Sequence, residues 1–85
     1  MCRIEFTRAA LKELAAAPAD IRKRARTKLE AVARDPFSPN KNVKALRGED
    51  AYRLRVGDWR VVYTLDGGTL VLTAIRIARR DRVYG

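Results

Sequence analysis

Apolar positions in the first part of the chain recur with a helical period. A short strand is predicted over residues 3–6, and the side chain of Thr7 is placed to cap a helix that follows it. Pro18 interrupts this helix, and a second helix begins there because proline suits the first helical turn. The expected apolar positions are Leu11, Leu14 and Ala15 on the first helix, and Ile21, Ala25, Leu29 and Val32 on the second.

The hydrophobic period changes from helical to alternating in the second part of the chain. A proline-containing stretch over residues 37–48 is expected to form a loop after the Asp-Pro pair that ends the second helix. Strands are predicted over residues 52–56 and 59–65, with a Gly-Asp pair between them as a two-residue hairpin turn. A second turn at residues 66–68 leads into a longer and more apolar strand over residues 69–77, as expected for a strand inside the sheet.

The predicted elements occur in the order β-α-α-β-β-β. This order indicates an α+β fold with a small, mainly antiparallel sheet and two helices packed on one face. A chain of 85 residues leaves room for one hydrophobic core, so residues 1–85 are expected to form a single domain. The hydrophobic fraction of 47% is typical of a folded chain rather than a disordered one.

The first hairpin brings arginine residues onto one face of the predicted sheet. With a two-residue turn, Arg55 lies opposite Arg60, and Arg53 shares their face. Like charges directly opposite each other destabilise a sheet by up to about 1 kcal/mol, whereas a phosphate bound between the two guanidinium groups reverses the sign. A solvated face covered by arginine stems is the alternative interpretation. The other face is expected to be apolar and to carry Tyr52, Trp59 and Tyr63.

The charge of the chain favours an anionic partner. There are 19 Lys and Arg residues against 10 Asp and Glu, a net charge of +9 that attracts nucleic acid or an acidic protein. The basic residues of the second helix are expected to form a solvated face, with a docking site for RNA as the alternative, and they are Arg22, Lys23, Arg24, Arg26 and Lys28. Those near the C-terminus either extend the arginine face or keep this end soluble, and they are Arg76, Arg79, Arg80 and Arg82.

Several classes of chemistry lack support in the sequence. Without histidine there is no Ser-His or Cys-His nucleophile pair, and the commonest metal ligand is missing. Because there is also no glycine-rich phosphate loop or metal-ligand cluster, we expect no metal site and no cofactor. Cys2 is the only cysteine, and no apolar run resembles a signal peptide or a membrane span. The protein is therefore expected in the cytoplasm, away from membranes.

One block of the chain resembles a known family. Residues 52–63 have the sequence YRLRVGDWRVVY, which resembles the RelE/ParE superfamily of bacterial and archaeal toxins from toxin-antitoxin pairs. The resemblance extends over nearly the whole chain, through residues 4–6, Ala10, Leu11, Leu14, Asp35, Pro36, residues 46–48, residues 77–80, Val83 and Tyr84. It implies a small α+β fold and a neutralising cognate antitoxin. In the RelE branch it also implies cleavage of messenger RNA in the ribosomal A site.

The resemblance implies roles for individual residues. RelE-type toxins carry basic residues before the hairpin turn, an arginine just after it, an arginine after the final strand and a tyrosine near the C-terminus. The implied catalytic residues are Arg55, Arg60, Arg80 and Tyr84, while Arg53, Arg79 and Arg82 are expected to bind RNA. Many relatives have lysine or histidine at some of these positions, whereas arginine holds a phosphate well and transfers protons poorly. Tyr84 is therefore the expected base, because nearby guanidinium groups favour its phenolate.

The sequence is consistent with three functions. The first is a ribosome-dependent endoribonuclease that cleaves messenger RNA and inhibits translation, without a metal or cofactor. The second follows the ParE branch, whose members share the fold but bind and inhibit DNA gyrase without enzymatic activity. The third is a basic RNA-binding domain without toxicity, which leaves the pairing of Arg55 with Arg60 without a specific task. The sequence favours the first of these functions.

Overall fold

The computed structural model of the chain describes residues 2–36, 38–46 and 51–79. The described elements in chain order are β1 (Arg3–Phe6), α1 (Arg8–Ala16), α2 (Ala19–Arg34), β2 (Val43–Ala45), β3 (Ala51–Val56), β4 (Trp59–Asp66) and β5 (Val71–Arg79). The strands form one sheet in the order β1-β5-β4-β3-β2. Only the β1–β5 pair is parallel among these neighbours, so the α+β fold with a mainly antiparallel sheet is confirmed.

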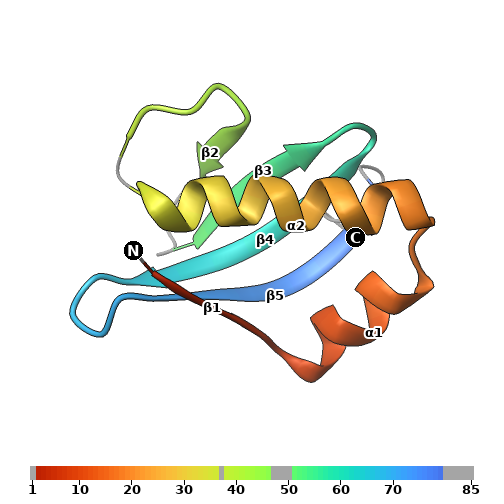
Figure 1. Cartoon of the computed structure of the whole chain (residues 1–85), viewed down its shortest axis with the longest axis horizontal. Coiled ribbons are helices and arrows are strands. Elements are labelled where there is room, and N and C mark those ends of the chain that lie inside the picture. Colours follow the sequence, from red (N-terminus) through yellow and green to blue (C-terminus); the bar gives the residue numbers. More distant parts are fainter. Residues whose placement is uncertain (1, 37, 47–50, 80–85) are drawn as a thin grey trace.

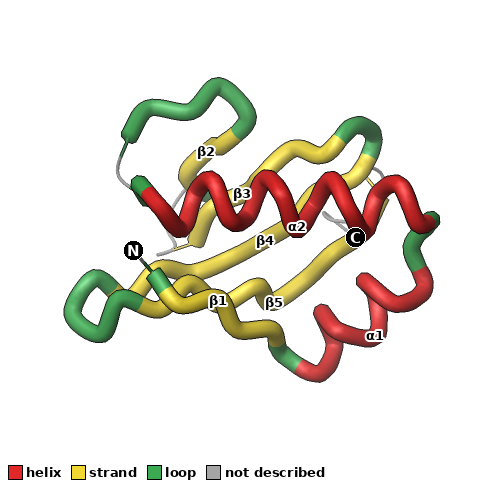
Figure 2. The backbone as a smooth tube through the Cα atoms, viewed as in Figure 1, coloured by secondary structure: helices red, strands yellow, loops and turns green. Residues whose placement is uncertain are grey.

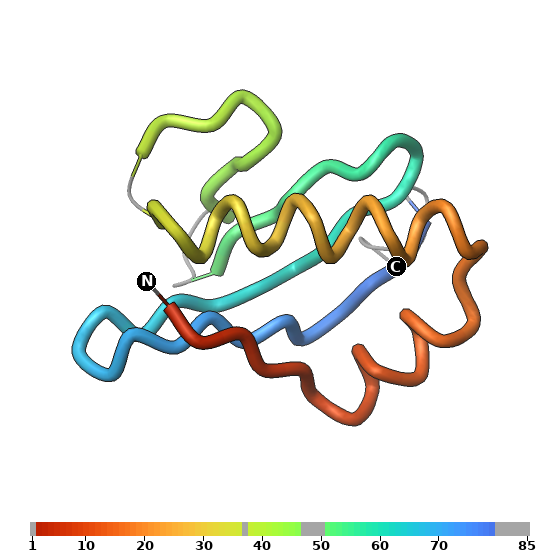
Figure 3. Tube along the Cα trace, viewed as in Figure 1, coloured from red at the N-terminus to blue at the C-terminus, as the bar shows by residue number. Residues whose placement is uncertain are grey.

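Strand β5 lies inside the sheet, between β1 and β4. Figure 3 shows the first strand of the chain running beside the last one, although they are far apart in sequence. This position explains why β5 is long and largely apolar. Strands pair with both of its edges, and its buried residues pack in the core.

The two helices and the sheet enclose one hydrophobic core. Helix α2 crosses one face of the sheet (Figures 1 and 2), and its expected stripe of Ile21, Ala25, Leu29 and Val32 is buried. The strand residues that share the core cluster include Leu54, Val56, Val61 and Tyr63. Helix α1 begins as predicted, because the Oγ1 atom of Thr7 accepts a hydrogen bond from the Ala10 amide at 3.1 Å. No helix of the described residues is long and apolar enough to cross a membrane.

The apolar face of α1 differs from the prediction. Leu11 is 51% exposed and Ala15 is exposed, whereas Ala10 and Leu14 are buried. The helix contacts β5 and β1 at one side of the sheet rather than lying across its middle, so it buries only a narrow stripe. The expected apolar positions of Leu11 and Ala15 are therefore wrong, and that of Leu14 is confirmed.

Strand β2 lies within residues 37–48, for which the sequence predicts a loop. Its three residues pair antiparallel with β3, and Val43 lies opposite Leu54. The Leu46 amide adds a hydrogen bond to the Ala51 carbonyl oxygen at 2.9 Å. The loop prediction is wrong here because the otherwise open edge of β3 supplies hydrogen-bond partners, which no local pattern reveals.

Strand β5 begins two residues later than predicted. The Oδ1 atom of Asp66 accepts hydrogen bonds from the amides of Gly68 at 3.0 Å and Thr69 at 3.2 Å. Leu70 has a φ of 56°, in the left-handed region, and ends the turn. Because Thr69 and Leu70 belong to the turn, β5 runs over Val71–Arg79 instead of residues 69–77.

Candidate functional site

The hairpin formed by β3 and β4 has the predicted register. Val56 lies opposite Trp59 on either side of a two-residue turn, and Arg55 lies opposite Arg60. Gly57 adopts a φ of 60° in this turn, which suits a residue without a Cβ atom. Side chains alternate along each strand, so Arg53, Arg55 and Arg60 share the face of the sheet that the helices do not cover. The prediction of an arginine face is confirmed.

The three arginines line a cleft together with residues that the sequence analysis missed. This basic cleft has a volume of about 190 Å³ and is lined by Lys41, Asn42, Lys44, Arg53, Arg55 and Arg60. Among these described residues there is no carboxylate. Lys44 of β2 lies directly opposite Arg53 of β3, so a second pair of like charges stands beside the first. Such crowding favours a bound anion, because a phosphate relieves the repulsion at both pairs.

The loop before β2 holds one side of the basic cleft. The Arg55 amide donates to the Asn42 carbonyl oxygen at 2.7 Å, and the Nη2 atom of Arg55 donates to the Asn42 Oδ1 atom at 3.3 Å. The backbone amide of Asn42 in turn donates to the Oδ1 atom of Asn40 at 2.8 Å. These bonds fix the backbone between α2 and β2 against β3, and thereby bring Lys41 to the cleft.

The turn holds the other side of the basic cleft. The Nη1 atom of Arg60 donates to the carbonyl oxygens of Gly57 and Trp59, each at 2.9 Å. The two arginines of the central pair are thus anchored on different segments, Arg55 on the loop and Arg60 on the turn. Preorganised cations of this kind need little rearrangement to bind a phosphate.

Arg79 lies outside the basic cleft. Arg79 lies opposite Trp59 in the ladder, so it belongs to the face of Trp59 and not to that of Arg60. It lines a separate groove of about 240 Å³ between α1 and the end of β5. Arg76 pairs with Glu13 at 3.4 Å in the same groove. An RNA-binding role of Arg79 stays a prediction, and Arg80, Arg82 and Tyr84 lie outside the described residues.

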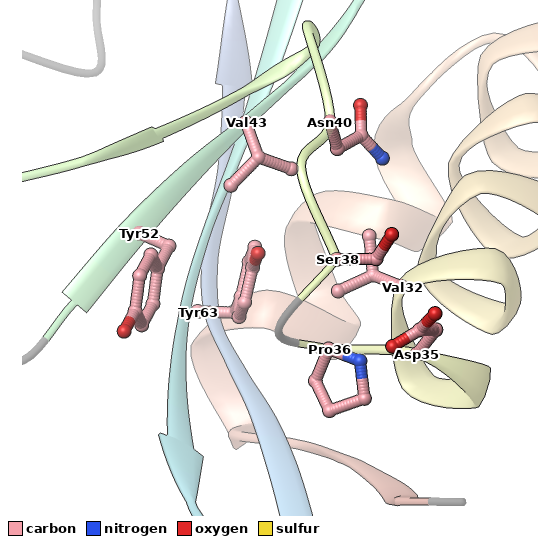
Figure 4. A pocket seen from close by; sticks show the side chains of 8 residues that line it. All are labelled: Val32, Asp35, Pro36, Ser38, Asn40, Val43, Tyr52 and Tyr63. Atoms are coloured by element: carbon pink, nitrogen blue, oxygen red, sulfur yellow. The ribbon is translucent and has the colours of Figure 1, made fainter.

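Two tyrosines form an aromatic pair on the helix side of the sheet. The ring centroids of Tyr52 and Tyr63 are 5.4 Å apart with an interplanar angle of 20°. Figure 4 shows both rings along one side of a cavity of about 270 Å³, with the end of α2 and the following loop on the other. Tyr63 is buried, and Tyr52 and Trp59 pack against the core. Their expected packing role is confirmed.

Burial raises the pKa of Tyr63 to about 12, and the neighbouring Tyr52 adds to the rise. The folded state therefore favours the neutral phenol, whose ordinary pKa is near 10. We expect this contribution to stability, up to about 2 kcal/mol, to be complete below pH 10 and to be lost as the pH rises through 12. Urea unfolding at increasing pH measures the loss. The decline should become shallower in Tyr63→Phe, and an equally steep decline in that variant would assign it to other groups.

No group of three or more His, Cys, Asp or Glu side chains that could hold a metal ion occurs within residues 2–36, 38–46 and 51–79. The basic cleft instead offers ammonium, guanidinium and amide donors, which are hydrogen-bond donors to phosphate oxygens.

The chain is similar to known toxins of toxin-antitoxin systems. The family model for the ParE toxin of the type II toxin-antitoxin system parDE matches residues 4–84. A Methanocaldococcus jannaschii protein named as toxin RelE1 is 29% identical over 83 residues, which cover 95% of this chain and 92% of that protein.

Solved structures have the same fold. A chain of the archaeal RelE-RelB complex from Pyrococcus horikoshii OT3 superposes with a TM-score of 0.82 at 26% identity, covering 95% of this chain and 97% of that chain. The isolated E. coli RelE toxin superposes with a TM-score of 0.81 at 27% identity, covering 99% of this chain and 92% of that chain. With a family model that spans nearly all of its residues, the chain belongs to the RelE/ParE superfamily of toxins from type II toxin-antitoxin systems.

Proposed function

We propose that this toxin is a ribosome-dependent endoribonuclease that cleaves messenger RNA and thereby inhibits translation. The observation that carries the proposal is the pairing of Arg55 with Arg60 in a cleft lined by further cations. Like charges directly opposite each other in a sheet repel, and a phosphodiester between the two guanidinium groups replaces that repulsion with charge-assisted hydrogen bonds. The similarity to proteins named RelE supports the choice of RNA as the polyanion.

RNA supplies its own nucleophile for this reaction. The 2′-hydroxyl oxygen attacks the adjacent phosphorus and forms a P–O2′ bond, while the bond from phosphorus to the 5′ oxygen of the next nucleotide breaks. The products are a 2′,3′-cyclic phosphate and a 5′-hydroxyl. Arg55, Arg60 and Arg80 stabilise the negative charge that accumulates on the phosphorane, and Arg53 holds a neighbouring phosphate. Arg79 and Arg82 contribute further contacts to the RNA backbone.

Two proton transfers complete the reaction. Tyr84, as a phenolate, removes the proton of the 2′-hydroxyl. The departing 5′ oxygen needs a proton, and Lys44 brings an ammonium group to the basic cleft that can donate one. This lysine supplies the acid that arginines provide poorly.

A cognate antitoxin is the expected protein partner, since the similar solved structures include RelE-RelB and RelBE complexes. We propose that an acidic or apolar antitoxin segment covers the basic cleft or displaces Tyr84. The toxin acts as a single domain over residues 1–85 in the cytoplasm, where ribosomes and messenger RNA are found. Titration with purified antitoxin tests this idea. Tight binding at low salt that left cleavage unchanged would contradict it.

Inhibition of DNA gyrase is the second candidate, because the matching family model describes a ParE toxin. Under that function the arginine face contacts protein rather than RNA. Expression of the toxin distinguishes the two candidates by metabolic labelling. An endoribonuclease stops protein synthesis first, whereas a gyrase inhibitor induces the DNA-damage response while translation continues.

Replacing Tyr84 with phenylalanine isolates the proposed proton transfer. The ring remains and the hydroxyl is lost, so we expect the single-turnover cleavage rate on ribosomes to fall about a hundredfold or more. Ribosome binding should stay near the wild-type level, since every Lys and Arg residue available for phosphate contacts remains. Tyr52→Phe is the control, because that ring stacks on Tyr63 outside the basic cleft. A Tyr84→Phe variant that cleaved at the wild-type rate would show that another group is the base.

A further inference from the structure

The basic residues of α2 do not form one uniform solvated face. The Nη1 atom of Arg22 donates to the Ala17 carbonyl oxygen at 2.6 Å, which ties this side of α2 to the end of α1. Arg24 and Lys28 are four residues apart, so they lie above one another on a single flank of the helix. That flank faces β3 and its turn, where both side chains make contacts.

Arg24 and Lys28 meet the hairpin that carries the catalytic arginines. A Cβ atom placed on Gly57 would lie 3.3 Å from the Nη1 atom of Arg24, so this guanidinium lies directly against the turn. The Nζ atom of Lys28 donates to the Arg55 carbonyl oxygen at 3.2 Å. Arg55 thus contacts α2 through its carbonyl oxygen, while its guanidinium contacts Asn42 in the basic cleft.

Positive charge accumulates around Lys28. Burial lowers the pKa of Lys28, and the charges of Arg24, Arg55 and Lys41 lower it further. Within the described residues, no ion pair joins Arg24, Lys28 or Lys41 to an acidic side chain. A bound anion is the group that would relieve this repulsion.

We propose that Arg24, Lys28 and Lys41 form a second phosphate-binding site, the rim site, which holds a phosphodiester of RNA other than the one that is cleaved. The identification of the ligand as RNA rests on the proposed function. The inference that a phosphate binds here rests on the positive charge of these three residues. Lys41 lines the basic cleft as well, so the two sites are adjacent along the edge of β3. The second phosphate belongs either to the messenger strand or to ribosomal RNA.

Binding measurements with two probes distinguish these sources. The first probe is a single-stranded RNA of 2′-O-methyl nucleotides, which lacks the nucleophile and is not cleaved. The second is a vacant ribosome without messenger RNA. We expect Arg24→Gln and Lys28→Gln to weaken binding roughly fivefold at low salt, to the first probe if the messenger strand occupies the rim site and to the second if ribosomal RNA does. The slope of log affinity against log salt should become shallower by about 0.7 to 0.9.

Arg26→Gln is the matched control on the same helix. It removes the same charge at a position about 200° round the helix axis from Arg24, on the flank away from the turn. Its salt slope should stay at the wild-type value with both probes. Arg24→Lys should restore most of the affinity, because it restores the charge.

Two results would overturn the rim site. One is that Arg24→Gln and Lys28→Gln match Arg26→Gln with both probes. The other is that they weaken antitoxin binding, or lower the melting temperature, without any change in the salt slope for RNA. The proposed function fails if the wild-type toxin cleaves no messenger RNA. The rim site is tested separately, because its readout is binding alone.

Discussion

Replacing Arg55 with threonine is expected to slow messenger RNA cleavage by about a hundred- to a thousandfold while stabilising the fold. The rate falls because one preorganised charge stabiliser typically contributes about 2.7 to 4 kcal/mol to the transition state. The fold gains up to about 1 kcal/mol because the like charge opposite Arg60 disappears and threonine suits a strand. Single-turnover cleavage on ribosomes and urea denaturation measure the two effects.

Arg3→Thr is the control for this substitution. Arg3 also lies on a strand, its side chain is 73% exposed, and it pairs with Glu5 away from the basic cleft. Cleavage by this variant should equal that of the wild type. If Arg55→Thr kept the wild-type rate, Arg55 would have no part in the chemistry. If it were less stable than the wild type, the repulsion between the paired arginines would already be compensated in the free protein.

Replacing Leu29 with alanine should have the largest effect on stability. This side chain is 1% exposed in the core cluster that joins α2 to β3 and β4. Truncation of a buried leucine costs about 2 to 5 kcal/mol, through lost burial and the cavity left behind. Small proteins have only about 5 to 15 kcal/mol of stability, so the urea midpoint should fall far below that of the wild type.

Leu11→Ala provides a matched comparison, since it makes the same substitution at a side chain that is 51% exposed. Its effect on the free energy of unfolding should stay within about 0.5 kcal/mol. Equal losses in the two variants would mean that α1 buries Leu11 in solution, contrary to the described packing.

The arginine face could be predicted because two local features determine it. A two-residue turn fixes the register, and the alternation of side chains then places Arg53, Arg55 and Arg60 on one face. The buried stripe of α2 could also be predicted from the sequence, because its apolar residues recur at helical spacing along the helix. In the structure this helix crosses the sheet. Both predictions depend only on residues that are close together in the sequence.

The rest of the basic cleft depends on pairing between distant segments. Lys41 and Lys44 reach it because β2 adds to the open edge of β3, and three residues are too few for a strand pattern. The alternation of polar and apolar residues over 42–45 is the one local sign of this strand. Arg79 could not be placed from composition, since its face depends on the register of β5 against β4. That ladder contains a bulge at Val62 and Tyr63.

Primer extension on messenger RNA recovered from an in vitro translation reaction tests whether the toxin cleaves at the ribosome. We expect new cDNA ends within the coding sequence when wild-type toxin and translating ribosomes are both present. No new ends should appear without ribosomes, and the signal should be strongly reduced with Arg55→Thr. Full-length cDNA together with undiminished protein synthesis would show that the toxin is not a ribosome-dependent endoribonuclease. Inhibition of DNA gyrase supercoiling by the same toxin preparation would then identify the ParE-like function instead.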